Sequence, residues 1–181
     1  MLLEKEKSFL ALIDVQARLL PGVHEHERLV KNCNWLVRLA HLMDVPAIGS
    51  EQYPDGLGHT EEGLRELVGE ANIHGKTCFS SIDDPGFYQS LKAYDREQVV
   101  VCGMESQACV MQSAMRMHEE GLEVFVVADA ISARDPFDTE ISLRRMEQAG
   151  IRLVTREMVG FEWLRRSDAS QFKAFSKEFL Q

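Results

Sequence analysis

The sequence predicts an α/β fold: a single three-layer, doubly wound domain in which helices cover both faces of a six-stranded parallel sheet. Short apolar runs alternate with longer amphipathic patterns from one end of the chain to the other. The apolar runs are rich in Val, Ile and Leu, which is typical of strands that are buried on both faces. No linker, repeat or low-complexity tract interrupts this alternation, so we expect residues 1–181 to form one domain.

The first half of the chain is expected to contain three strands and three helices. Residues 9–13 form an apolar run that ends at Asp14. Apolar residues then recur at helical spacing, which predicts a helix over 26–43. Pro85 suits the first turn of a helix, where no N–H partner is needed. The elements expected in this half are strands 9–13, 45–49 and 76–79 and helices 26–43, near 64–67 and 85–94.

The second half repeats the alternation and ends in two helices. Gly121 and Gly150 each follow a helical pattern, and glycine at that position favours the left-handed turn that ends a helix. The apolar runs between these patterns are short and rich in Val and Ile. The elements expected here are strands 98–102, 122–128 and 151–154, and helices from about 109 to 121, 138–149, 157–166 and 170–179.

Composition excludes some partners. The chain has 20 Lys and Arg against 29 Asp and Glu, a net charge of −9, and no basic block that could bind phosphates, so we expect no nucleic-acid partner. The apolar runs are too short to span a bilayer, so no membrane partner is expected. The N-terminus lacks signal-peptide order, and the 4 cysteines form no CxxC pair. Reduced thiols in a cytoplasmic protein are the expectation.

Three chemically reactive residues lie at or just beyond expected strands. Asp14 follows the first strand, Lys76 lies at the third, and Cys109 comes just after the fourth. Parallel strands end at one edge of the sheet, and ligands bind there where the strand order reverses. Cys109 falls in the first turn of a helix, with Ser106 suited to the N-cap. The helix N-terminus and the Lys76 ammonium both favour a thiolate, so Cys109 is a candidate nucleophile.

These residues lie in segments that resemble the isochorismatase-like cysteine hydrolase superfamily. The matching segments are Ala-Leu-Ile-Asp-Val-Gln at 11–16, Lys-Thr-Cys-Phe-Ser at 76–80, Gly-Met-Glu-Ser-Gln-Ala-Cys-Val at 103–110, and the stretch 121–132. Residues 51–54, 162–165 and 171–173 are similar to a subgroup of isochorismatase-domain proteins whose substrates are poorly defined. The resemblance implies a six-stranded parallel sheet, an Asp-Lys-Cys triad and a homo-oligomer.

The resemblance also implies a role for each residue of the triad. Asp14 would be the general base, Cys109 the nucleophile and Lys76 their electrostatic partner. The backbone N–H groups of Glu105 and Cys109 would form the oxyanion hole. A cis peptide between Met104 and Glu105 would shape that hole.

Residues near the expected strand ends are candidates for substrate binding. Gln16, Gln52 and Tyr53 would face the substrate, with loop packing or subunit contact as the alternative. Nicotinamidases of the superfamily carry an Asp-x-His pair after the second strand, whereas this chain has Tyr53 in place of the histidine. His59 and His74 do not have the spacing of a tetrahedral site. We therefore expect no metal and no other cofactor.

The favoured function is hydrolysis of a small amide, or a related acyl or C–N compound, through a thioester acyl-enzyme. The alternatives are a catalytically idle oligomeric scaffold and a nicotinamidase-type amidase. A nucleotide-binding domain ranks low because no GxGxxG follows the first strand and no P-loop motif occurs. Hydrolysis of the isochorismate vinyl ether is disfavoured because that chemistry requires no cysteine.

Overall fold

The computed structural model describes residues 1–180, and in it six strands form one sheet in the order β3-β2-β1-β4-β5-β6. Every neighbouring pair is parallel. This confirms the α/β doubly wound fold expected from the alternating sequence pattern. The strands are β1 (Ser8–Ile13), β2 (Ala47–Gln52), β3 (Ile73–Lys76), β4 (Gln98–Met104), β5 (Glu123–Ser132) and β6 (Arg152–Val154).

The order of the strands reverses between β1 and β4. The chain builds outward from β1 through β2 to β3, then returns to place β4 on the other side of β1. At the carboxyl ends of these two central strands, Ile13 is paired with Gly103. The segments that follow β1 and β4 at this reversal carry Asp14 and Cys109, and in parallel sheets ligands commonly bind at such a point.

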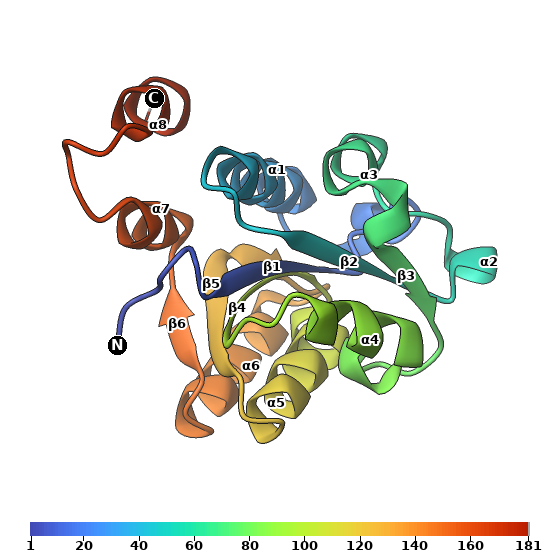
Figure 1. Ribbon diagram of the computed structural model, residues 1–181. Helices are drawn as coiled ribbons and strands as arrows, with labels where there is room; N and C mark the ends of the chain where they lie inside the picture. The colour runs from blue at the N-terminus through green and yellow to red at the C-terminus, as the bar shows by residue number, and fades with distance from the viewer. Residues whose placement is uncertain (181) are drawn as a thin grey trace.

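Helices cover both faces of the sheet, as Figure 1 shows. The upper layer in that view holds α1 (His26–Leu42), α3 (Glu62–Val68), α7 (Arg156–Leu164) and α8 (Phe172–Phe179), and the lower layer holds α4 (Pro85–Ala93), α5 (Met111–Glu119) and α6 (Pro136–Gln148). The short α2 (Pro54–Leu57) lies beyond β2, and single turns occur at Leu20–Gly22, Glu70–Asn72, Ser81–Asp83 and Ser106–Val110. None of the helices within residues 1–180 is long and apolar enough to cross a bilayer.

Strand β1 shows how the sheet serves two cores. Leu10 and Leu12 belong to the apolar cluster under α1, α3, α7 and α8, whereas Phe9, Ala11 and Ile13 belong to the cluster above α4, α5 and α6. All of these side chains are at most 1% exposed. Because successive side chains of a strand point to opposite faces, a continuous apolar run is what a doubly covered strand requires.

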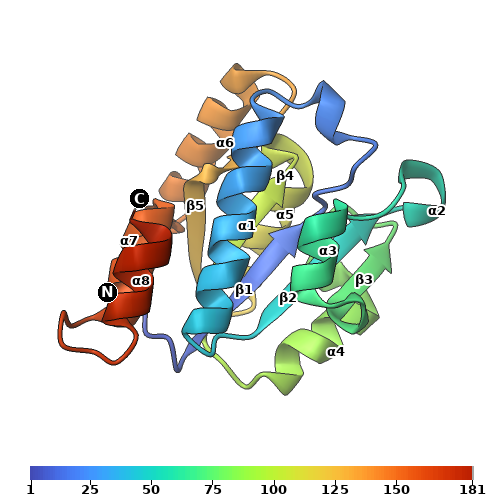
Figure 2. The same cartoon turned by 90° about the horizontal axis from the view of Figure 1, so that it is seen from above.

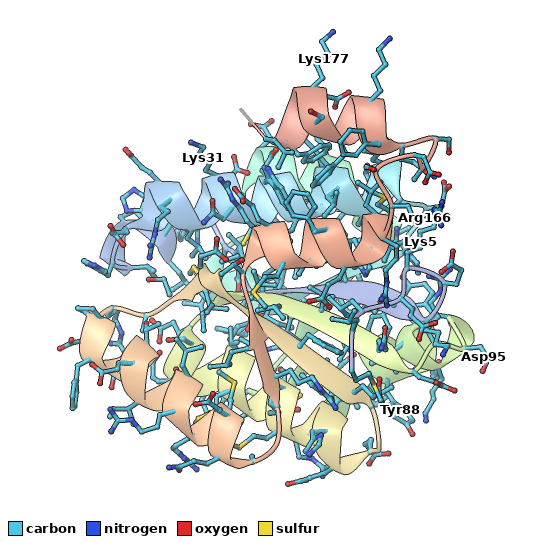
Figure 3. The ribbon with its side chains drawn as sticks, turned by 90° about the vertical axis from the view of Figure 1, so that its left-hand side faces the viewer. Lys5, Lys31, Tyr88, Asp95, Arg166 and Lys177 are labelled. Atoms are coloured by element: carbon cyan, nitrogen blue, oxygen red, sulfur yellow. The ribbon has the colours of Figure 1, made fainter. Side chains whose placement is uncertain are left out.

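The C-terminal helix α8 lies outside α7 and beside α1 (Figure 2). Its two buried phenylalanines, Phe175 and Phe179, pack against Trp35 of α1, and the Trp35 indole N–H donates to the Phe179 carbonyl at 3.1 Å. The opposite side of α8 faces solvent, where Lys177 points away from the domain (Figure 3). An amphipathic pattern at 172–179 therefore closes the upper layer.

The third strand differs most from the expectation. It runs over Ile73–Lys76 and not over 76–79, with Ile73 opposite Gly49 and Lys76 opposite Gln52. After Lys76 the chain turns, and the carbonyls of Cys78 and Phe79 accept hydrogen bonds from the Lys76 ammonium. The apolar Cys78 and Phe79 favour a strand in the sequence, but in the structure their backbone carbonyls bind the buried Lys76 ammonium. Lys76 is consequently the last residue of the strand.

Candidate active site

Asp14 and Lys76 form a buried ion pair at the carboxyl edge of the sheet. Asp14 follows β1 directly with φ of 51°, a left-handed turn that aspartate tolerates better than most residues. Lys76 reaches from β3 past the end of β2, and its Nζ lies 2.7 Å from Asp14 Oδ2. The two side chains are 2% and 0% exposed. A charge so fully removed from water requires such a partner.

The Lys76 ammonium has further acceptors in its shell. Its Nζ lies 2.6 Å from Gln52 Oε1, and the carbonyl oxygens of Cys78 and Phe79 lie at 3.2 and 3.1 Å. With Asp14 these acceptors more than satisfy the three protons of an ammonium group. The protein therefore supplies an acceptor for every hydrogen bond that the Lys76 ammonium can donate, and these contacts fix the position of Nζ.

Cys109 approaches the same point from the other side of the strand-order reversal. Strand β4 ends at Met104, a cis peptide joins Met104 to Glu105, and a π-helical turn over Ser106–Val110 leads into α5. Cys109 lies in that turn and is 7% exposed, with its Sγ 3.8 Å from Gln52 Oε1. Gln52 thus touches both the sulfur and the Lys76 ammonium. The structure brings Asp14, Lys76 and Cys109 together, as the strand ends predict.

The protonation state of Cys109 differs from the expectation. Burial, the negative charge of Asp14 and a hydrogen bond to it together raise the pKa of the thiol to about 12, against the opposing effect of Lys76. Glu105 also acts to raise it. The expected thiolate is therefore wrong for the resting site, because burial and two carboxylates outweigh one ammonium. At neutral pH, Cys109 is a thiol with a carboxylate beside it.

The turn before Cys109 is held by side chains. The Glu105 carboxylate accepts from Arg134 Nε at 3.1 Å and from Gln107 Nε2 at 3.1 Å. The Glu105 carbonyl accepts from the N–H groups of Ala108 and Val110, which flank Cys109. The cis peptide before Glu105 lies where the resemblance places it. The oxyanion role of the Glu105 and Cys109 N–H groups stays a prediction.

Ser106 is not the N-cap that its spacing suggested. Glu105 has the extended conformation of the N-cap, so Ser106 is already the first residue of the turn. Its hydroxyl is shared with Thr139 Oγ1 of α6 at 3.0 Å. The π-helical turn accommodates one more residue than the expected α-helix, and such turns recur at functional sites.

The three candidate substrate residues have different surroundings. Gln16 is fully buried, donates to the Gln52 and Gly58 carbonyls and accepts from the Gln52 N–H, so its side chain fixes two loops and does not face an open pocket. Gln52 contacts Lys76 and Cys109. Tyr53 is 53% exposed and lines an open pocket of about 400 Å³ together with Lys76. The lining of that pocket includes neither Asp14 nor Cys109, so of the three candidates Gln52 is the one that contacts the reactive groups.

The histidines considered for a metal lie in separate environments. His59 Nδ1 is 3.0 Å from Glu51 Oε2, while His74 packs edge-on against Phe87 of α4. Glu51 Oε1 is occupied by the Thr60 N–H and hydroxyl. Within residues 1–180, no three His, Cys, Asp or Glu side chains gather as a metal site would require. The sequence-based expectation of no metal stays a prediction.

Sequence reasoning missed the groups behind Asp14. Ser50 of β2 donates to Asp14 Oδ1 at 2.7 Å, and Ser81 and Ser113 extend this contact away from the carboxylate. All three serines are at most 1% exposed. A single serine within an apolar segment has no sequence pattern that predicts a role at a site. Its role becomes visible only through hydrogen bonds to residues that are distant in the sequence. The one available hint was that Ser50 lies at the end of a strand next to that of Asp14.

Comparison with known proteins identifies the family of this chain. The family model described as the isochorismatase domain matches residues 8–158. The chain belongs to the isochorismatase family. Isochorismatase domain-containing protein 2A of Mus musculus is 35% identical over 178 residues, which cover 95% of this chain and 82% of the relative.

Solved structures share the whole fold of this isochorismatase-family protein. The structure named MAR1 ribonuclease from Caenorhabditis elegans superposes with a TM-score of 0.93 at 32% identity and covers 100% of this chain and 93% of that chain. The YcaC gene product of Escherichia coli is described as an octameric hydrolase of unknown specificity. It superposes with a TM-score of 0.91 at 27% identity, and the match covers 99% of this chain and 92% of that chain. The protein therefore has an isochorismatase-like hydrolase fold.

Proposed function

We propose that this protein is a cysteine hydrolase that cleaves a small amide, or a related acyl or C–N compound, through a thioester on Cys109. The observation that carries the proposal is the buried Asp14–Lys76 pair placed against the Cys109 sulfur. A buried ion pair costs desolvation energy that an apolar pair of similar volume would not. Its position beside a thiol at the strand-order reversal favours a chemical role over a purely structural one.

The first half of the reaction forms the thioester. The Cys109 sulfur attacks the substrate carbonyl carbon while its proton passes to the Asp14 carboxylate. The carbonyl π electrons move onto oxygen, which accepts hydrogen bonds from the N–H groups of Glu105 and Cys109 in this proposal. As the tetrahedral intermediate collapses, the C–N bond breaks and Asp14 returns the proton to the departing nitrogen. A thiol with a pKa of about 12 makes a nearby base a requirement for this step.

The second half regenerates the thiol. A water molecule attacks the thioester carbonyl while Asp14 accepts one of its protons. The C–S bond then breaks, and the sulfur leaves with the electron pair and recovers the proton from Asp14. Lys76 Nζ lies 2.7 Å from Asp14 Oδ2 in the resting site, and its role in this proposal is to keep the carboxylate paired whenever it is ionised. Gln52, in contact with both the ammonium and the sulfur, restricts where each can move.

Small molecules fit this site better than polymers. Asp14, Lys76 and Cys109 are each at most 7% exposed, so only a compact acyl group can reach the sulfur. The net charge of −9 also disfavours a phosphate-rich substrate such as RNA. We infer a homo-oligomer as the working form, since the YcaC relative is described as octameric, and light scattering of the purified protein tests this.

The decisive experiment is a panel of small primary and secondary amides assayed for amine or ammonia release. Wild type is compared with Cys109→Ala and Cys109→Ser, and with Cys33→Ala as a matched cysteine control away from the site. We expect turnover of at least one amide that both Cys109 variants reduce by about 10³-fold or more and that Cys33→Ala retains. Turnover that survives in Cys109→Ala would overturn the role of Cys109 as nucleophile, and no turnover with any amide would overturn the proposed amidase and favour an idle scaffold.

A further inference from the structure

Three buried serine hydroxyls form a row of hydrogen bonds that runs from Asp14 to α5, the helix that follows Cys109. Ser50 Oγ lies 2.7 Å from Asp14 Oδ1, Ser81 Oγ lies 2.9 Å from Ser50 Oγ, and Ser113 Oγ lies 3.2 Å from Ser81 Oγ. The three serines come from β2, from the turn over Ser81–Asp83 and from α5. None is more than 1% exposed. We call Ser50, Ser81 and Ser113 the serine chain.

The direction of the hydrogen bonds in the serine chain is fixed by chemistry. An ionised carboxylate can only accept, so Ser50 must donate to Asp14 and must accept from Ser81. Ser81 has then used its only proton, so it must accept from Ser113. Ser113 in turn accepts from the backbone N–H of Ser81 at 2.8 Å. Every hydroxyl dipole therefore points its positive end toward the Asp14 carboxylate.

The serine chain ends at the backbone N–H of Ser81, which donates to Ser113, and this end limits the roles that the chain of hydroxyls can have. A backbone N–H does not release its proton at ordinary pH, so the serine chain cannot carry protons between Asp14 and solvent. What remains is electrostatic and geometric: aligned hydroxyls strengthen one another and stabilise the negative charge of the acceptor at their end. Ser50 also donates to Asp14 Oδ1, whereas Lys76 binds the other carboxylate oxygen, Oδ2.

The serine chain also links the three segments that carry the candidate triad. Ser50 binds the carboxylate that follows β1, and Ser81 lies directly after the segment whose carbonyls bind Lys76. Ser113 is one helical turn beyond Cys109. The charged and titratable groups around Asp14 are Lys76 from β3 and Cys109 from the π-helical turn, with Glu105 beside the sulfur.

We propose that Ser50, Ser81 and Ser113 are positioning residues that hold the Asp14 carboxylate aimed at the Cys109 thiol. This inference rests on the proposed function, in which Asp14 is the base. It makes a graded prediction: the influence of each serine on the reactivity of Cys109 declines with its distance along the chain. Packing alone would produce no such gradient.

The test is the rate of Cys109 alkylation by iodoacetamide at pH 7, followed by peptide mass spectrometry. Ser50→Ala, Ser81→Ala and Ser113→Ala are compared with wild type, and Ser142→Ala is the matched control because Ser142 is also buried but donates within α6. The charge of Asp14 and its hydrogen bond to the thiol raise the pKa of Cys109, so a carboxylate that loses its Oδ1 donor and its fixed orientation opposes the thiolate less. Alkylation is therefore expected to become faster in Ser50→Ala, by part of the increase expected for Asp14→Asn. Smaller increases follow for Ser81→Ala and Ser113→Ala, and none for Ser142→Ala.

A cycle with Asp14→Asn separates positioning from packing. The serine chain acts through the carboxylate, so Ser50→Ala is expected to leave the alkylation rate unchanged in the Asp14→Asn background. Equal effects in both backgrounds, or an unchanged rate in all three serine variants, would overturn the inference. If Ser50→Ala does not fold by circular dichroism, Ser81→Ala and Ser113→Ala carry the same test with smaller increases.

The two proposals can fail separately. Iodoacetamide reports on Cys109 without any substrate, so the alkylation rate is independent of the amide panel. No turnover of any amide together with graded increases in the alkylation rate would overturn the proposed amidase and leave the role of the serine chain intact. Amide turnover together with an unchanged alkylation rate would do the reverse.

Discussion

Lys76 Nζ lies 2.7 Å from Asp14 Oδ2, and the two residues come from strands that are separated in the sheet by β2. The contact is possible because a lysine side chain is long enough to pass the end of the intervening strand, where Gln52 also binds the ammonium. Both charges are almost wholly removed from water. The stability of this pair and the reactivity of Cys109 are therefore coupled, and changes to either partner have predictable signs.

Replacing the lysine leaves the carboxylate buried and unpaired. Lys76→Met is expected to lower the free energy of unfolding by about 3–5 kcal/mol, as for other broken buried pairs. It also removes the positive charge that opposes the rise in the Cys109 pKa, so this pKa rises further and alkylation at pH 7 slows. Urea unfolding and iodoacetamide kinetics measure both effects. Lys177→Met on the exposed side of α8 is the control, and equal stability of the two variants would contradict the pairing.

Replacing the carboxylate has opposite effects on alkylation and on hydrolysis. Asp14→Asn removes a negative charge and a hydrogen bond that both raise the Cys109 pKa, so the pKa falls below about 12 and more thiolate is present at pH 7. Iodoacetamide then reacts faster, while amide turnover is lost because no base remains. The surface variant Asp168→Asn should change neither rate. Slower alkylation in Asp14→Asn would show that the carboxylate does not disfavour the thiolate.

The loop after β2 has a pH-dependent anchor in Glu51. Burial of this carboxyl acts to raise its pKa, but hydrogen bonds from Thr60 and from His59 outweigh it and hold the pKa below its ordinary value of 4.5. A depressed pKa contributes stability that is present above the ordinary value and is lost as the pH falls through the lowered one. Glu51→Gln is thus expected to be less stable than wild type at pH 7.

Urea midpoints measured between pH 7 and pH 3 test this linkage. The difference between wild type and Glu51→Gln should shrink as the pH drops below about 4.5, whereas the exposed variant Glu66→Gln should match wild type throughout. A difference that stays constant with pH would mean that Glu51 contributes through packing alone.

Gly103 of β4 lies so close to the backbone of β1 that no side chain fits at this position. Its φ is 127°, which L residues rarely adopt, and a Cβ built there would collide with the backbone of Ile13 on β1. Gly103→Ala must therefore separate the strands that lead to Asp14 and Cys109, at a cost on the order of 3 kcal/mol or more. The midpoint of thermal unfolding measures this cost. Gly22→Ala, which meets no neighbouring atom, is the control, and equal midpoints would refute the steric argument.

The sequence predicted the meeting of Asp14, Lys76 and Cys109 because strand ends share one edge in a parallel sheet. It misplaced the third strand, since apolar residues after Lys76 resembled a strand while their carbonyls serve the ammonium. It also predicted a thiolate, because the helix N-terminus is visible in a sequence whereas the depth of burial is not.

Other features depend on contacts that no local pattern records. Gln16 was expected near substrate from its position after β1, yet its amide spans two loops through backbone groups far along the chain. The serine chain combines residues 50, 81 and 113, each unremarkable in its own segment. Such networks arise from tertiary packing, so only the folded coordinates identify them.

The most direct test of the central claim is to trap the covalent intermediate. Wild-type protein is mixed with an amide that it turns over, quenched in acid within milliseconds to seconds, and digested for peptide mass spectrometry. We predict that the peptide containing Cys109 gains the mass of the substrate acyl group, and that Cys109→Ser shows no such thioester. Sustained amide turnover with an unmodified Cys109 peptide at every time point, or an acyl group on another residue, would contradict a thioester mechanism at Cys109.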